Sequence, residues 1–268
     1  MKREARAGRS QQVGLWLLAA LPLVVFLLFP ILALILKAFH SETLQQLLSA
    51  ETLRPLTLSF FTSFIALLLI VLFGTPVAFV LARGEFPGRR LLEVLVEWPT
   101  VLPPAVAGLA LLLALGRKGL AGQYLHEWGV DIAFSTTAVI LAQVFVAAPY
   151  FIKAAAASLS SVDRDLLDAA EMDGADSWQV FRCVLLPLSW RGFVGGMGLS
   201  WARALGEFGA TILFAGNLPG VSQTMPLAVY LGFESDYRLA ISLSVILLIL
   251  SFGLLLGIRA ILERGKEF

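Results

Sequence analysis

Long apolar runs separated by short polar connections dominate the pattern of this chain. Six runs contain the roughly 20 mostly apolar residues that a helix needs to cross the hydrocarbon core of a bilayer. They lie at residues 13–36, 57–82, 94–115, 133–155, 192–215 and 239–261. The pattern therefore predicts six transmembrane helices in an all-α polytopic membrane protein.

Composition supports this interpretation. Of the 268 residues, 58% are hydrophobic and 15% are charged, and the mean hydropathy is +0.84. A soluble domain of this length needs more polar surface, so the excess apolar area must face lipid. We expect residues 1–268 to form a single transmembrane domain.

The distribution of Lys and Arg predicts the orientation, because cytoplasmic connections carry an excess of both. Five of these residues lie in alternate connections: Lys37, Arg54, Arg117, Lys118 and Arg238. Fourteen lie in the N-terminal tail, the second and fourth connections and the C-terminal end: Lys2, Arg3, Arg6, Arg9, Arg83, Arg89, Arg90, Lys153, Arg164, Arg182, Arg191, Arg259, Arg264 and Lys266. We therefore expect both termini, including the tail 1–12, to be cytoplasmic. The first run is as long as a full span and no small-x-small site closely follows it, so we expect an uncleaved anchor.

Motifs that carry chemistry are absent from the sequence. His40 and His126 are the only histidines and form no H-E-x-x-H pair, and no G-x-S-x-G turn occurs. The segment GRKGLAG at 116–122 is not a phosphate loop, so any ATP must be hydrolysed by another protein. We expect no catalytic residue, no metal site and no cofactor bound by this chain. Cys183 stands alone, and the net charge of +1 does not indicate a nucleic-acid partner.

The third predicted span opens with EWPTVLPPAVAG, at residues 97–108. Pro99, Pro103 and Pro104 prevent a regular helix over its first two turns. Irregular backbone at membrane depth persists where protein or a water-filled cavity shields it. The prolines therefore indicate either a segment that faces the bundle interior or a span that starts at the cytoplasmic interface.

The fifth predicted span has the least lipid-like sequence. Gly198, Ala202, Gly206 and Ala210 recur every four residues and predict a ridge that another helix approaches closely. In the same span, Arg203 and Glu207 are spaced to pair. Each charge costs on the order of 2.5 to 3.5 kcal/mol at this depth, so both should face the interior. Their pair either holds the bundle together or lies along a solute path. The predicted pore or bundle-interior residues are Arg203, Glu207, Gly206, Gly209, Pro103 and Pro104.

Residues 216–238, GNLPGVSQTMPLAVYLGFESDYR, are predicted to form an external connection. Pro219, Gly220 and Pro226 are expected to interrupt helix there. Neutral side chains that form hydrogen bonds make this segment a candidate gate loop. The gate candidates are Asn217, Gln223 and Thr224, and the alternative is an ordinary external loop.

An acid-rich stretch, DAAEMDGADSWQVFRCVLLP at 168–187, interrupts the apolar pattern. With the residues before it, it predicts a cytoplasmic hairpin of two short helices over 161–187. Ser161 is expected to cap the first helix, Gly174 to end it in the left-handed conformation, and Asp176 to cap the second. An acidic face with an apolar stripe suits the groove of a soluble partner better than an anionic leaflet. The alternative is a hairpin that packs beneath its own spans.

The hairpin resembles the "EAA" loop of binding-protein-dependent ABC importer permeases. The matching residues are Asp168, Ala169 and Ala170, then Gly174 after three residues, and VLLP at 184–187, with Asp for the usual Glu and Val for the usual Ile. The segments LPPAVAG (102–108), ARALGEFGATILFAGNLPG (202–220) and QTMPLAVY (223–230) are similar to the molybdate branch of the oxyanion importers. The sulfate branch is similar too, so sulfate, thiosulfate and tungstate stay open as substrates.

The resemblance implies a type I importer permease in a bacterial inner membrane, surrounded by lipid. It implies that the chain pairs with a second copy of itself around a pore. It also implies two cytoplasmic ATPase subunits that bind the hairpin as a coupling helix, and a periplasmic oxyanion-binding protein that delivers the substrate. The coupling residues would be Asp168, Ala169, Ala170, Asp173, Gly174 and Trp178.

Two other classes of protein fit part of the pattern. A secondary transporter driven by an ion gradient predicts broken helices in two related halves, but residues 1–130 and 131–268 show no clear repeat. A membrane scaffold or intramembrane enzyme would have only Arg203 and Glu207 to supply chemistry within the predicted spans. Neither class explains the acid-rich hairpin.

Overall fold

The computed structural model describes residues 2–39 and 50–264, with side chains over 16–38 and 51–263. Every regular element within these ranges is helical, which confirms the all-α prediction. His40 lies outside the described residues. The helices are α1 (Lys2–Phe39), α3 (Ala50–Arg83), α4 (Arg89–Val101), α5 (Pro104–Leu115), α6 (Gly122–Glu127), α7 (Thr136–Ser160), α8 (Arg164–Met172), α9 (Ser177–Val180), a π-helical turn (Phe181–Leu185), α10 (Leu186–Leu205), α11 (Gly209–Phe214), α12 (Met225–Ser235) and α13 (Tyr237–Arg264).

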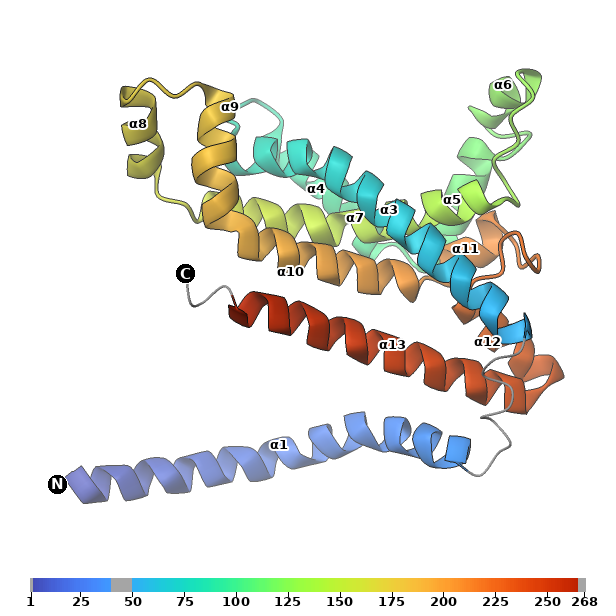
Figure 1. The fold of residues 1–268 in the computed structure, drawn as a ribbon, viewed down its shortest axis with the longest axis horizontal. Helices are drawn as coiled ribbons and strands as arrows, with labels where there is room; N and C mark the ends of the chain where they lie inside the picture. The colour runs from blue at the N-terminus through green and yellow to red at the C-terminus, as the bar shows by residue number, and fades with distance from the viewer. Residues whose placement is uncertain (1, 40–49, 265–268) are drawn as a thin grey trace.

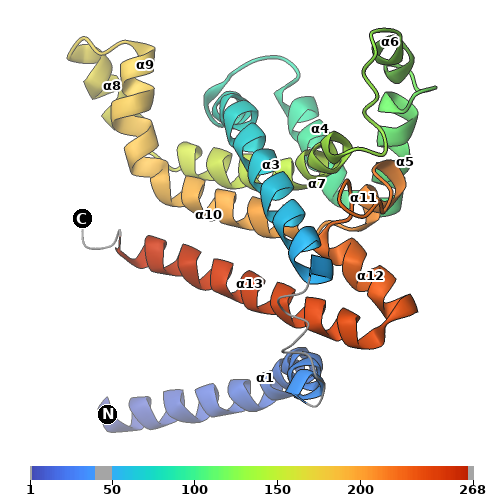
Figure 2. The same cartoon turned by 45° about the vertical axis from the view of Figure 1, so that its right-hand side comes forward.

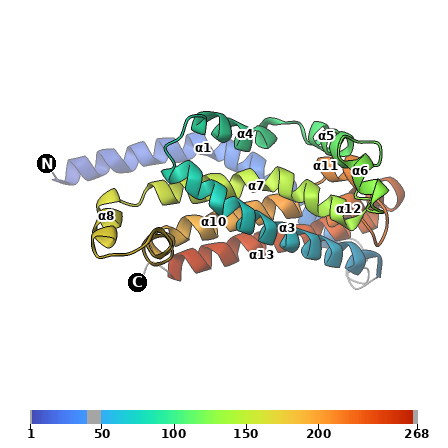
Figure 3. The same ribbon diagram turned by 90° about the horizontal axis from the view of Figure 1, so that it is seen from above.

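Three long helices, α3, α7 and α10, form the centre of the bundle. Helix α13 runs alongside α10, and α1 lies outermost, against α13 (Figure 1). Seen from above, α7 lies between α4 and α10 (Figure 3). The start of α1 and the end of α13 lie at the same end of the bundle as α8 and α9, whereas α6 and α12 lie at the other end (Figure 2). We call these the hairpin end and the opposite end.

Small residues allow α10 to approach α7 closely. A Cβ atom added at Gly192 would lie 2.1 Å from Cβ of Ser158, and one added at Gly196 would lie 2.9 Å from Cβ of Ala154. The two backbones reach this distance because these α10 positions carry no side chain. Phe151 of α7 is fully buried in the resulting core.

The predicted ridge on the fifth span is confirmed in part. At Gly198 an added Cβ would lie 2.2 Å from the side chain of Ile258, so α10 and α13 do pack closely there. Ala202 and Gly206 are exposed, however, and Ala210 belongs to α11. The four-residue period fails because α10 ends one residue before Gly206, so the later positions lie on a different helix.

Within the described residues, four helices are long and apolar enough to cross a membrane, and a bent pair raises the number to five. The four cover Trp16–Ala38, Glu51–Arg83, Thr136–Ser160 and Tyr237–Glu263, which agree with four of the predicted spans. The third and fifth predicted spans are replaced by broken helices. In place of the third, α4 and α5 meet at 113°, because the two prolines at 103 and 104 lack the amide hydrogens that helix continuation requires. The fifth is divided between α10 and α11.

The predicted external connection contains a helix that the sequence analysis missed. Helix α12 packs against α3 and α13 and buries Met225, Leu227 and Ala228. Pro226 does not interrupt it, because the first turn of a helix has no partner for the amide hydrogen that proline lacks. Pro219 and Gly220 lie before the helix, in the turn where helix was expected to be absent.

Candidate functional site

The first arm of the hairpin is α8, which begins and ends through local hydrogen bonds. The carboxylate of Asp163 accepts a hydrogen bond from the backbone of Asp165 at 3.2 Å. The prediction that Ser161 caps this helix is wrong, because its hydroxyl donates to the carbonyl of Ser158 at 2.7 Å at the end of α7. Gly174 has a φ of 92°, which confirms the predicted left-handed end of the arm.

The second arm is α9 and the π-helical turn that continues it into α10. Asp176 and Gln179 form a capping box, in which each side chain accepts from the other residue's backbone, at 2.8 and 2.9 Å. The prediction that Asp176 caps the second helix is confirmed. Because no loop separates α9 from α10, this arm extends the bundle helix.

Most of the surface of α8 is exposed, as is part of the second arm. Helix α8 has no buried residue, and Asp168, Ala169 and Asp173 are all exposed. Met172 is 88% exposed and Trp178 is 65% exposed. The hairpin projects from the bundle (Figure 1), so carboxylates and large apolar side chains are available together to another protein.

Three contacts fasten the base of the hairpin to α3 and the loop after it. The guanidinium of Arg83 donates through Nη2 to the carbonyls of Leu159, at 2.6 Å, and Val162, at 2.7 Å. The rings of Phe181 and Phe79 meet edge to face, with centroids 5.7 Å apart. Arg164 pairs with Glu85 at 3.2 Å, with both side chains exposed. From the sequence, Arg83 was expected only to be one of the cytoplasmic basic residues, and no local pattern signals these partners.

Arg203 and Glu207 form the ion pair that their spacing predicts, at the break between α10 and α11. Nη1 of Arg203 lies 2.5 Å from Oε2 of Glu207, and the side chains are 26% and 1% exposed. The other oxygen of Glu207 accepts from the backbone of Ala210 at 2.8 Å. Nε2 of Gln143 on α7 donates to the carbonyl of Ala204 at 3.1 Å, at the end of α10. The break is therefore held by side chains from two helices.

The remaining residues of the predicted pore set lie around the same break. Pro104 and Gly209 are in contact, since a Cβ added at Gly209 would lie 2.6 Å from Cβ of Pro104. Gly108 packs as closely on the backbone of Ala210, so α5 and α11 form one unit. Pro103, Pro104 and Gly206 are exposed in the single chain. The structure therefore gathers these residues near one another, and their role in a pore stays a prediction.

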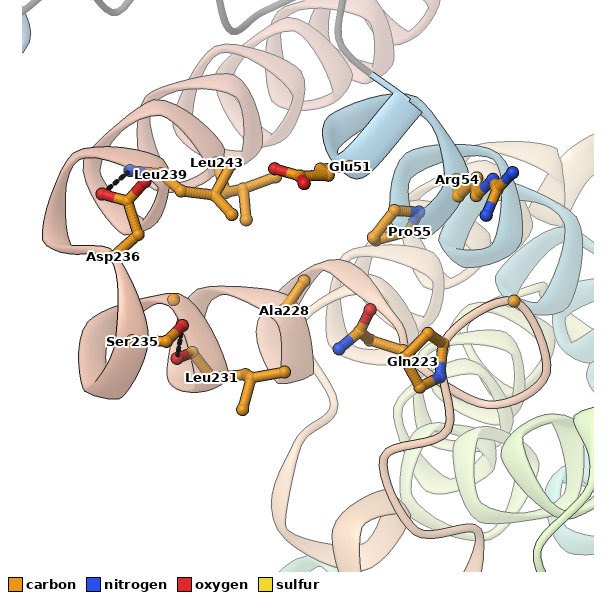
Figure 4. Close-up of a pocket in the computed structure, with 13 residues that line it drawn as sticks. Glu51, Arg54, Pro55, Gln223, Ala228, Leu231, Ser235, Asp236, Leu239 and Leu243 are labelled. Carbon is orange, nitrogen blue, oxygen red and sulfur yellow. Dashed lines mark hydrogen bonds between the residues drawn. The ribbon is translucent and has the colours of Figure 1, made fainter.

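The three gate candidates lie in different surroundings. Thr224 is buried at the start of α12, and Nδ2 of Asn217 lies 3.5 Å from the carbonyl of Leu227. Gln223 lines a cavity of about 480 Å³ between α3, α12 and α13 (Figure 4). Glu51, Arg54 and Asp236 line it too, so the cavity carries both signs of charge.

Two further ion pairs were not expected from the sequence. Lys153, predicted in a connection, lies within α7 and pairs with Glu97 of α4 at 2.8 Å. At the opposite end, Arg117 pairs with Asp131 at 2.7 Å. A hydrogen bond from Arg117 is the main cause that lowers the pKa of the Asp131 carboxyl. Within the described residues, no three His, Cys, Asp or Glu side chains are grouped as metal ligands would be.

The broken helices and the projecting hairpin define a class of membrane transport protein. Residues 71–266 match the family described as "Binding-protein-dependent transport system inner membrane component". The chain belongs to this family and is the membrane-embedded permease component of an ABC importer, distinct from the subunit that hydrolyses ATP. This membership excludes the secondary transporter, scaffold and intramembrane enzyme interpretations.

Three relatives are similar to this chain over most of its length. The chain is 40% identical over 250 residues to "Molybdenum transport system permease protein ModB" of Mycobacterium tuberculosis, covering 93% of this chain and 95% of that protein. It is 39% identical over 237 residues to "Probable transport system permease protein NifC" of Clostridium pasteurianum, covering 88% and 82%. It is 33% identical over 259 residues to "Probable sulfate transport system permease protein cysT" of Nephroselmis olivacea, covering 94% and 90%.

Solved structures support the fold at low sequence identity. A chain of a bacterial ABC transporter involved in the import of alginate matches with a TM-score of 0.75 and 15% identity, covering 98% of this chain and 99% of that one. A chain of the MetNI methionine ABC transporter, in an inward-facing conformation, matches with a TM-score of 0.60 and 18% identity, covering 84% and 98%. The architecture is therefore that of ABC importer permeases.

Proposed function

We propose that this chain forms, with a second copy of itself, the pathway by which an ATP-driven importer moves molybdate across a bacterial inner membrane. Similarity to molybdate permeases along 93% of the chain supports this substrate. Relatives at lower identity include a sulfate permease, so sulfate is the second candidate. In this proposal α10 and α11 together form the fifth of the six spans of a type I importer. The hairpin end faces the cytoplasm.

The exposed surface of α8 is the observation that carries the coupling part of the proposal. Two cytoplasmic ATPase subunits bind this surface, one on each copy of the chain. Its carboxylates and the exposed side chains of Met172 and Trp178 supply charge and apolar area for docking. ATP binding closes the ATPase pair, displaces both hairpins and opens the pathway outward, and hydrolysis resets it.

Two cations within the helices, Lys153 and Arg203, are paired in a way that should keep an anion from binding tightly. A dianion cannot cross hydrocarbon, so the pathway must supply water and hydrogen-bond donors. Lys153 and Arg203 are both paired with carboxylates, which offsets their attraction for a dianion. We therefore assign substrate affinity mainly to a periplasmic binding protein, which docks at the opposite end.

Reconstitution tests the proposal. The chain is placed in proteoliposomes with its ATPase subunit and its binding protein, and ATP-dependent uptake is measured with molybdate, tungstate and sulfate. We expect molybdate uptake that requires ATP and the ATPase subunit. Uptake without that subunit would contradict the coupling proposal, and a preference for sulfate would contradict the substrate.

A further inference from the structure

The last turns of α3 make contact with both arms of the hairpin. Arg83 ends α3, and Phe79 lies one helical turn before it, so both side chains emerge on the same face. Arg83 reaches the base of the first arm, and Phe79 meets the ring of Phe181 in the second arm. Helix α3 is therefore fastened to the hairpin, although it is far from the hairpin in sequence.

The Arg83 contact joins a charged donor to backbone groups that have few other partners. The last carbonyls of a helix have no partner within the helix, and Leu159 lies in the last turn of α7. Its carbonyl and that of Val162 both accept from Nη2 of Arg83, at 2.6 and 2.7 Å. Both residues are buried. Hydrogen bonds from a charged donor are stronger than neutral ones, so this is the firmest of the three fastenings.

The other two contacts of the hairpin base are weaker or less directional than the hydrogen bonds of Arg83. Glu85 and Arg164 are 76% and 73% exposed, and exposed ion pairs contribute little to stability. The edge-to-face contact between Phe79 and Phe181 is apolar and packs against a broader buried cluster, so it is less directional than a hydrogen bond. Arg83 therefore adds a directional contact at this base, where Val162 and Leu81 of α3 also share one buried apolar cluster.

We propose that Arg83 is a positioning residue that locks the base of the hairpin to α3, so that a displaced hairpin carries α3 with it. The inference rests on the proposed function, since an ATPase must move the hairpin. Without this lock the hairpin can tilt on the bundle that α3, α7 and α10 form together, so its displacement moves the bundle less. ATP is then hydrolysed with less substrate moved for each turnover.

The ratio of ATP hydrolysed to molybdate imported tests this in the reconstituted transporter. Arg83→Gln should raise the ratio about tenfold, as expected when a hydrogen bond to a charged group is lost from a two-state element. Arg90→Gln is the matched control, since it removes an exposed guanidinium from α4, outside the hairpin and its three contacts with α3 and the following loop, and it should leave the ratio unchanged. A role in stability alone would lower the amount of assembled transporter and leave the ratio of the remainder as in wild type.

A distance measurement gives a second readout that does not depend on transport. Spin labels replace the exposed side chains of Val80 on α3 and Leu166 on α8, and the assembled complex is measured with and without bound ATP. Wild type should keep one narrow distance distribution in both states, and Arg83→Gln should broaden it when ATP is bound.

Some outcomes would overturn the inference. These are an unchanged ratio with an unchanged distribution in Arg83→Gln, or a wild-type distribution that changes with ATP as much as the variant does. Arg83→Met keeps the aliphatic stem and tests the same point if the Gln variant does not assemble. Failure of both to assemble would assign Arg83 to assembly and also overturn the inference. Failure of the proposed function is distinct, because wild type itself would then show no ATP-driven molybdate uptake.

Discussion

Arg203 and Glu207 are joined across the break between α10 and α11, with Nη1 of Arg203 2.5 Å from Oε2 of Glu207. The same carboxylate accepts a hydrogen bond from the backbone of Ala210 at the start of α11. Glu207 is almost fully buried and Arg203 is partly exposed. The pair and this hydrogen bond therefore join the end of α10 to the start of α11 inside the bundle.

Loss of Arg203 should destabilise the fold more than loss of both charges. Arg203→Met leaves the buried carboxylate of Glu207 without its cation, which costs about 3 to 5 kcal/mol. The double variant Arg203→Met, Glu207→Gln removes both charges and retains an oxygen to accept from Ala210, so it should lie closer to wild type. Thermal unfolding of the purified protein in detergent measures both. Equal destabilisation by the single and double variants would show that the charge is not what matters.

Gly174→Val should uncouple ATP hydrolysis from uptake. The φ of 92° at Gly174 places the residue in the left-handed region, with open space around it, so the substitution strains the backbone by about 1 to 2 kcal/mol or more without a clash. The arm of α8 should then change direction. ATP hydrolysed per molybdate imported is the measurement.

Gly88 offers a matched control for this prediction. It has a φ of 96°, is equally open, and precedes α4 outside the hairpin. Gly88→Val should bring a similar strain and leave coupling as in wild type. Similar loss of coupling in both variants would point to a general effect on stability.

Gly192→Ala should destabilise the contact between α10 and α7. Its Cβ would lie 2.1 Å from Cβ of Ser158, so the helices must separate, at a cost of about 1 to 3 kcal/mol. At Gly195 an added Cβ meets nothing within 4 Å. Gly195→Ala should therefore be neutral or stabilise by up to about 1 kcal/mol, through helix propensity. We expect a lower unfolding temperature for Gly192→Ala and an unchanged or higher one for Gly195→Ala, and a loss of stability at Gly195 as large as at Gly192 would contradict this packing.

The ion pair between Arg117 and Asp131 should make the opposite end sensitive to acid. The hydrogen bond from Arg117 holds the pKa of Asp131 below its ordinary value of 3.8. Because the folded pKa is the lower one, the contribution to stability is complete above the ordinary value and disappears as the pH falls through the folded pKa. The unfolding temperatures of wild type and Asp131→Asn should therefore differ near neutral pH and converge as the pH falls below 3.8 and through the lower folded pKa.

Glu127→Gln serves as the control for the acid effect, since it removes a nearby carboxylate outside this ion pair. Its unfolding temperature should follow that of wild type at each pH. A difference between wild type and Asp131→Asn that grows on acidification would contradict the sign argued above. High salt should reduce the difference at neutral pH, because both side chains are exposed.

The hairpin shows which parts of a site can be predicted from sequence. Asp176 caps α9 through Gln179, three residues away, and Gly174 ends α8 with its own dihedral angle. Such features depend on residues within one or two turns, so the local order of residues is enough to predict them. Ser161 was misassigned because Asp163, two residues on, competes for the same role and caps the helix instead.

The break at Glu207 and the lock at Arg83 show the opposite case. Gln143 reaches the carbonyl of Ala204 across 61 residues, and Arg83 reaches Val162 across 79. Nothing in the local pattern signals that these groups meet. The bend between α4 and α5 has a local cause in the prolines, but its angle of 113° depends on where α11 packs against α5.

By itself, then, the sequence determined that the chain is helical, that it faces lipid, and where a polar hairpin with its caps interrupts the apolar runs. These follow from hydrophobic length and from hydrogen bonds between near neighbours. Only the tertiary structure decided that the fifth predicted span is broken, that residues 225–235 are helical, and which side chains fasten the hairpin to the bundle. Those outcomes depend on contacts between distant segments, whose free energy exists only after the helices have packed together.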